Sequence, residues 1–130
     1  MKILIVDDDP TTRKILALFL RGKGHEVMHA ENGLDALEKL GREPVNLVVS
    51  DLNMPYMDGI EFVKSLKADD ALSHIPVLMV TTERDPAERE RALASGASAY
   101  LVKPVTADAV NREIRDIVKN IFTRGGVAHA

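Results

Sequence analysis

Acidic side chains follow two apolar runs in this sequence, and their type and position could support phosphoryl chemistry. Asp7 and Asp8 come directly after the apolar residues 3–6, and Asp51 follows the run at residues 46–50. A carboxylate can attack phosphorus to form an aspartyl phosphate, and oxygen-only ligands suit a hard cation such as Mg²⁺. Gathered carboxylates repel each other unless a cation neutralises them. We therefore expect a magnesium-dependent site for phosphoryl transfer wherever the fold brings these acids together.

The elements that must position these acids can be read from short apolar runs and helix caps. Short, mostly apolar runs bounded by turn residues predict parallel strands at residues 3–6, 26–30, 46–50, 75–80 and 97–102, and the continuous apolar stretches at residues 3–6 and 47–49 are typical of buried strands. Each run is followed by a residue that can cap a helix, and these residues are Asp9, Asn32, Asp58, Asp85 and Thr106. The sequence thus alternates five strands with five helices.

This alternation predicts an α/β fold of the (βα)5 type, a doubly wound five-stranded parallel sheet with right-handed crossovers and helices on both faces. Parallel strands share one direction, so the residues that follow them meet at one edge, where open α/β sheets bind their ligands. Thr81 ends the fourth predicted strand and Lys103 follows the fifth. We expect both to lie beside the acids, where an ammonium group and a hydroxyl could hold a phosphoryl group.

Helical spacing also predicts which helices are firmly packed. Apolar stripes run along the first helix, at Ile15, Leu16, Phe19 and Leu20, and along the last, at Val110, Ile114, Ile117, Val118 and Ile121. By contrast, the helix after Asp85 carries Leu93 as its only large apolar residue and many alternating Glu and Arg side chains. We expect this fourth helix to be the most loosely held.

Length and charge limit the classes of function. The 130 residues fit one domain, which we place at residues 1–122, followed by a short disordered tail at residues 123–130. With 17 Lys and Arg against 20 Asp and Glu, the net charge of −3 favours neither nucleic-acid binding nor adsorption to a membrane. The sequence has no cysteine, no membrane-length apolar stretch and no signal peptide. We expect a soluble cytoplasmic protein.

The acids at positions 7, 8 and 51 stand together with Asn53, Met54-Pro55, Thr81, Tyr100 and Lys103-Pro104. In this combination the chain resembles a CheY-like receiver domain of bacterial two-component response regulators, from about residue 2 to residue 122. The resemblance implies a stand-alone receiver with the flavodoxin-like strand order 2-1-3-4-5. It also implies that Asp7 and Asp8 bind Mg²⁺ and that Asp51 is phosphorylated.

The same resemblance assigns the remaining site residues. Asn53 would give its backbone carbonyl to the metal, Thr81 would be the switch hydroxyl, and Tyr100 the rotating aromatic residue. Lys103 would bind the phosphate, and its peptide bond to Pro104 would be cis. Asn53 and Glu83 occupy positions that tune hydrolysis of the phosphate in the family, but their identities do not give a rate. Thr82 is bulkier than the small residue often found after the switch hydroxyl, and we expect its bulk to restrict access to the phosphate.

The resemblance further implies a regulatory protein and not an enzyme. Its partners would be a sensor histidine kinase or a phosphotransfer protein, and a downstream protein target. That target would bind the surface formed by the fourth helix, the fifth strand and the fifth helix. The expected oligomeric state is a monomer or a weak, phosphorylation-dependent dimer.

A phosphohydrolase of the haloacid-dehalogenase type is the main alternative. Residues 7–11 fit its D-x-D-x-T motif, with Asp7 as nucleophile and Asp9 as acid/base. The short chain leaves no room for a substrate cap, and that class does not explain Asp51, Asn53 or Met54-Pro55. A flavin-binding module is disfavoured because the chain lacks a Ser/Thr/Gly-rich phosphate loop and the acids would repel the cofactor's phosphate.

Overall fold

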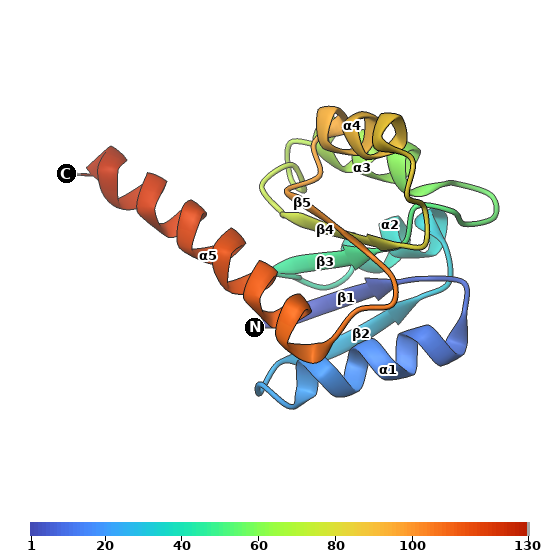
Figure 1. Cartoon of the computed structure of the whole chain (residues 1–130). Coiled ribbons are helices and arrows are strands. Elements are labelled where there is room, and N and C mark those ends of the chain that lie inside the picture. Colours follow the sequence, from blue (N-terminus) through green and yellow to red (C-terminus); the bar gives the residue numbers. More distant parts are fainter. Residues whose placement is uncertain (130) are drawn as a thin grey trace.

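Five strands alternate with five helices in the computed structural model, which describes the backbone of residues 1–129 and the side chains of residues 1–122. In chain order the elements are β1 (Lys2–Val6), α1 (Pro10–Arg21), β2 (Glu26–Ala30), α2 (Gly33–Leu40), β3 (Leu47–Ser50), α3 (Gly59–Ala68), β4 (Val77–Thr81), α4 (Pro86–Ser95), β5 (Ala99–Val102) and α5 (Ala107–His129). Figure 1 shows them around one central sheet.

The strands form one parallel sheet in the order β2-β1-β3-β4-β5. Its register pairs Val6 with both Ala30 and Ser50, so β1, β2 and β3 end at the same level. The residues that follow β1 and β3 therefore emerge side by side. Both the predicted fold class and the predicted strand order are confirmed.

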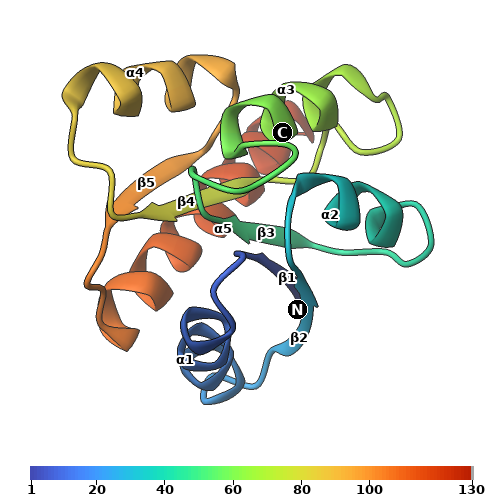
Figure 2. The same cartoon turned by 90° about the vertical axis from the view of Figure 1, so that its right-hand side faces the viewer.

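Helices cover both faces of the sheet and form two separate apolar layers (Figure 2). On one face, Ala36 of α2, Phe62 of α3 and Ala92 of α4 pack over the sheet. On the other, Leu20 of α1 and Ile114 of α5 do so. The inner strand residues 3–6, 47–50 and 77–81 are almost fully buried, as a parallel sheet covered on both sides requires, whereas the edge strands β2 and β5 are partly exposed.

The helix starts follow from single capping residues. The carboxylates or amide oxygens of Asp9, Asn32, Asp58 and Asp85 each accept a hydrogen bond from a backbone N–H of the first helical turn. The hydroxyl of Thr106 accepts one from Ala109 at the start of α5. Because these bonds are local, the predicted caps are all found in place.

The predicted apolar stripes are only partly buried. Ile15 of α1 is 45% exposed, and Val118 and Ile121 of α5 are 37% and 50% exposed, so these assignments to the packed faces are wrong. The cause in α5 is its length, because the helix extends past the edge of the sheet (Figure 1). The backbone is helical up to His129, where we expected a disordered tail, and the domain boundary at residue 122 stays a prediction. None of the helices in the described part of the chain is both long and apolar enough to cross a membrane.

Candidate functional site

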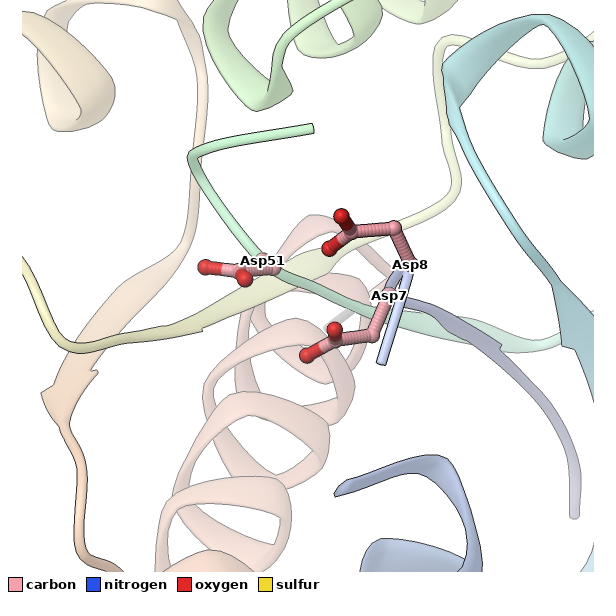
Figure 3. Close-up of side chains that lie close together, drawn as sticks. All are labelled: Asp7, Asp8 and Asp51. Atoms are coloured by element: carbon pink, nitrogen blue, oxygen red, sulfur yellow. The ribbon is translucent and has the colours of Figure 1, made fainter. Parts of the chain in front are cut away.

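Three carboxylates meet at the carboxyl edge of the sheet (Figure 3). One oxygen each of Asp7, Asp8 and Asp51 can be chosen so that all lie within 4.8 Å of one another. Asp7 is buried, Asp51 is partly buried and Asp8 is exposed. The convergence expected from the strand directions is therefore present, although 42 residues of sequence lie between Asp8 and Asp51.

Backbone amides hold the two inner carboxylates in place. The N–H of Asp9 donates to Asp7 Oδ1 at 2.9 Å, and the N–H of Leu52 donates to Asp51 Oδ1 at 2.7 Å. The chain at Asp51 is in turn fixed to β1, since its own N–H donates to the carbonyl of Val6 at 2.8 Å. Each carboxylate thus has one oxygen fixed by the backbone and keeps the other for a cation.

Lys103 provides the first cation. Its Nζ lies 2.9 Å from Asp7 Oδ2 and 3.4 Å from Asp51 Oδ2, and its side chain is only 16% exposed. Burial by itself lowers the pKa of Lys103, but hydrogen bonding to Asp7 and the charge of Asp51 outweigh it, so the pKa lies above its usual value. Lys103 is therefore charged at neutral pH and contacts Asp7 more closely than the predicted phosphoacceptor.

The remaining charge suits a hard divalent ion. Three carboxylates share one ammonium group, so the cluster keeps excess negative charge, and all its candidate ligands are oxygens. Asn53, whose backbone carbonyl is the fourth predicted ligand, lines the same shallow pocket of about 400 Å³ as Asp8. The residues present therefore fit Mg²⁺, with Asp7, Asp8, Asp51 and the Asn53 carbonyl to hold it.

The predicted switch residues meet at the loop between β4 and α4. Thr81 is fully buried, and its Oγ1 accepts a hydrogen bond from the N–H of Glu83 at 3.2 Å. Tyr100 is only 8% exposed, and its hydroxyl donates to the carbonyl of Glu83 at 2.9 Å. Burial, followed by the charge of Glu83, raises the pKa of the Tyr100 hydroxyl. The aromatic ring therefore points inward, and both side chains are tied to the same residue.

The positions next to the switch residues differ in their surroundings. Thr82 is exposed, so its side chain stands free at the edge of the site. Glu83 turns toward the start of α4, where its Oε1 accepts a hydrogen bond from the N–H of Asp85 at 2.9 Å. The Lys103–Pro104 peptide bond is cis, the form that the sequence resemblance implies.

Two residues contribute to the site in ways that the sequence analysis missed. The Arg13 guanidinium donates to the carbonyl of Asp7 at 2.6 Å and so ties α1 to the acidic cluster. Gly59 lies so close to Asp51 that a Cβ there would sit 2.4 Å from the Asp51 carbonyl oxygen. The spacing of the acidic residues gave no indication that Arg13 would contact them. Gly59 was already explained as part of a helix start, so nothing in the sequence indicated its close packing against Asp51.

Asp9 has a purely structural role in this geometry. Its Oδ1 accepts from the Thr11 N–H and its Oδ2 from the Thr12 hydroxyl. The hydrogen bond from Thr12 and then that from Thr11 lower the pKa of Asp9. Asp9 is an N-cap held in its ionised form, which is a poor state for a general acid.

The fold and the site together define a doubly wound α/β domain with an acidic, cation-binding cluster at its strand ends. Over residues 3–115 the chain matches the model of the response regulator receiver domain family. A chemotaxis protein CheY homolog of Campylobacter jejuni is 39% identical over 120 residues, which are 91% of this chain and 92% of that protein. The chain belongs to the response regulator receiver domain family.

Solved structures agree with this assignment. The chemotaxis response regulator CheY4 of Vibrio cholerae has a TM-score of 0.84 at 34% identity, covering 89% of this chain and 97% of its own. A putative response regulator from Chloroflexus aurantiacus has a TM-score of 0.87 at 30% identity, covering 91% and 97%. The chain is thus a CheY-like receiver of two-component signalling, which is a regulatory class and not an enzyme class in the ordinary sense.

Proposed function

We propose that Asp51 accepts a phosphoryl group from a phosphohistidine of a partner kinase or phosphotransfer protein, in a reaction that requires Mg²⁺. One observation carries this proposal, namely that Asp51 shares its site with two further carboxylates and with the Lys103 ammonium. Of these acids, Asp51 is partly buried, whereas Asp7 is buried and Asp8 is exposed. It can therefore be reached by a phosphodonor while its neighbours bind the cation.

The transfer follows from the roles of the residues around Asp51. A carboxylate oxygen of Asp51 forms a bond to phosphorus while the phosphorus–nitrogen bond of the phosphohistidine breaks, and the electron pair of that bond returns to the imidazole. Lys103 stands 3.4 Å from Asp51 Oδ2 and holds negative charge on the incoming group. Bound Mg²⁺ supplies further charge neutralisation for the phosphoryl oxygens.

The phosphorylated state changes a protein-binding surface through the loop between β4 and α4. Thr81 and Tyr100 both bond to Glu83, so a movement of Thr81 toward the phosphate shifts this loop and the start of α4. We place the downstream target on the α4, β5 and α5 surface, because α4 has a single buried residue and can move at low cost. Thr82 at the edge of the site would limit access of water to the phosphate.

The phosphohydrolase alternative requires Asp9 to act as an acid and base. Both oxygens of Asp9 already serve the cap of α1, and the lowered pKa keeps the group ionised. These contacts argue against that role and favour Asp51 over Asp7 as the acceptor.

The experiment is to treat the protein with a small acyl phosphate, with and without Mg²⁺, and to find the modified residue by mass spectrometry. Borohydride reduces an aspartyl phosphate to homoserine and releases the phosphate, so we expect a peptide with homoserine at position 51. None should form without the divalent ion, and none in Asp51→Asn. Asp9→Asn is the matched control because asparagine caps a helix as well as aspartate does. It should be labelled normally. Label on Asp7, or loss of label in Asp9→Asn, would support the phosphohydrolase instead.

A further inference from the structure

A second concave surface lies at the opposite edge of the sheet from Asp51. It is a groove of about 560 Å³ beneath the part of α5 that extends past the domain, close to Met1 and to the turn that follows α1. Figure 1 shows α5 passing beside the chain's amino terminus before it extends away from the domain, whereas the strand ends that carry the acids point the other way. The groove shares no residue with the acidic cluster, with α4 or with β5.

Apolar residues recur every four positions along the part of α5 that lines the groove. Ile114, Val118 and Phe122 follow one another at intervals of one helical turn and line the groove, and Phe122 is 82% exposed. Side chains at this spacing form a continuous ridge, against which another helix can pack. The domain itself leaves the outer part of this ridge uncovered.

The charges around the ridge all have one sign. Arg115 and Lys119 follow the apolar residues at the same four-residue interval, and Lys23 lines the groove from the α1 side. No acidic side chain occurs among the described residues that line it. His25 adds no charge at neutral pH, because burial and then the nearby amino terminus lower its pKa. Lys23, Arg115 and Lys119 thus form a basic rim around the groove, although the whole chain has a net charge of −3.

An unsatisfied polar group lies in the same place. Asn111 lines the groove and is 5% exposed. Its amide nitrogen donates to the carbonyls of Phe19 and Ala107, which fixes the orientation of the amide. Its Oδ1 has no hydrogen-bond partner, and in the described part of the chain it is the one buried side-chain polar atom of this kind. The two amide bonds join α5 to α1 at the groove, and the buried Oδ1 is out of the reach of a partner on the surface.

We propose that this groove binds an amphipathic helix of a partner protein that carries a row of Asp or Glu beside its apolar stripe. The apolar ridge of α5 matches the partner's stripe, and Arg115, Lys119 and Lys23 match its acids. A second copy of the chain fits poorly if it docks through its own α5. Arg115 and Lys119 of one copy would then face Arg115 and Lys119 of the other, and like charges repel. An anionic membrane fits poorly as well, because a flat bilayer cannot fill a concave groove.

The test uses the whole chain and a fluorescent synthetic peptide of about 18 residues, with leucines at helical spacing flanked by glutamates. A matched peptide has lysine in place of every glutamate. We expect saturable binding of the glutamate peptide by fluorescence anisotropy and little binding of the lysine peptide. The variant Arg115→Glu/Lys119→Glu should bind the glutamate peptide at least about tenfold more weakly than the parent, and it should bind the lysine peptide instead. That reversal also shows that the variant is folded.

Two further variants separate the site from general effects. Arg42→Glu/Lys64→Glu changes the net charge equally at exposed residues elsewhere and should bind the glutamate peptide as the parent does. Phe122→Ser removes an exposed ring and should weaken binding severalfold. Equal binding of the glutamate peptide by the parent and by Arg115→Glu/Lys119→Glu would overturn the proposal. So would binding of anionic phosphatidylglycerol vesicles without any peptide binding, or a dimer in sedimentation that Phe122→Ser abolishes.

Discussion

Helices α3 and α4 are neighbours on the same face of the sheet, each has 10 residues, and each begins after an aspartate cap. They differ in what they bury. α3 buries five residues, among them Phe62, Val63 and Leu66, whereas α4 buries only Ala92. Length and capping are therefore equal, and the difference in anchoring comes from the apolar residues alone.

The difference matters because both helices adjoin the site of Asp51, the proposed phosphoacceptor. α3 is bound tightly to it, since Gly59 packs against the carbonyl of Asp51 and its N–H donates to Leu52 O at 2.7 Å. α4 is connected to the site through the loop that holds Thr81 and Tyr100. One side of the site is thus firmly anchored and the other is weakly anchored, and in the proposed switch only the second side moves.

The largest effect is expected from truncating the anchor of each helix. Phe62→Ala removes a fully buried ring and should lower the free energy of unfolding by about 3–5 kcal/mol. Leu93→Ala in α4 removes a partly buried side chain and should cost about 1 kcal/mol. Urea denaturation followed by circular dichroism measures both values. Similar losses for the two variants would remove the basis for calling α4 the movable helix.

A smaller effect is expected from adding one methyl group at the two glycines that serve these helices. In Gly59→Ala the new Cβ meets backbone atoms, the Asp51 carbonyl oxygen at 2.4 Å and Leu52 Cα at 2.9 Å, which cannot give way easily. We expect a loss of about 1–3 kcal/mol of stability, together with slower labelling of Asp51 by an acyl phosphate.

Gly96→Ala is the matched change at the end of α4. Its new Cβ meets the flexible stem of Lys67 at 2.8 Å, and its φ of +120° is strained for alanine. This variant should lose stability too, but Asp51 should be labelled at the parent rate. If Gly96→Ala slowed labelling as much as Gly59→Ala, the support of the acceptor would not belong to α3 alone.

These contrasts also show what the sequence alone could and could not predict. Caps such as Asp58 and Asp85 were predictable because a cap is a bond within four residues of chain. The meeting of Asp7 and Asp51 was predictable because parallel strands share one direction. Val118 was placed wrongly because helical spacing tells which residues share a face but not where the sheet beneath that face ends.

The finer contacts of the site depend on distances that no sequence pattern encodes. Lys103 was expected near the acids, but its closer approach to Asp7 than to Asp51 comes from the path of the chain after β5. In the same way, Gly59 was predicted as part of a helix start. Its close contact with the Asp51 carbonyl depends on how α3 docks on β3, which is tertiary packing.

Removing the caps should separate local from global stability. Asp58→Ala and Asp85→Ala each lose one capping bond, to Glu61 N–H and Ala87 N–H, at a cost of about 1 kcal/mol to the helix. In α3 the buried residues keep the helix formed, so the loss should appear in global unfolding. In α4 we expect faster amide exchange across residues 86–95 with a smaller change in global stability. Hydrogen exchange with mass spectrometry distinguishes the two, and protected α4 amides in Asp85→Ala would contradict the expectation.

The smallest effect concerns Lys67, the residue that joins the two helices. It belongs to the last turn of α3, its stem packs against Gly96 after α4, and its Nζ donates to the carbonyls of Ser73 and Ile75. Burial lowers the pKa of Lys67 below its usual 10.5. Between the lowered folded pKa and the unfolded value the unfolded chain binds more protons, so the contribution of Lys67 to stability rises with pH in that window. The difference in unfolding free energy between the parent and Lys67→Met should therefore grow in favour of the parent as the pH approaches 10.5. A difference in unfolding free energy that stays constant or shrinks over that range would contradict this expectation. It would mean that the Lys67 ammonium is as well solvated in the folded domain as in the unfolded chain, so that only the packing of its stem against Gly96 joins α3 to α4.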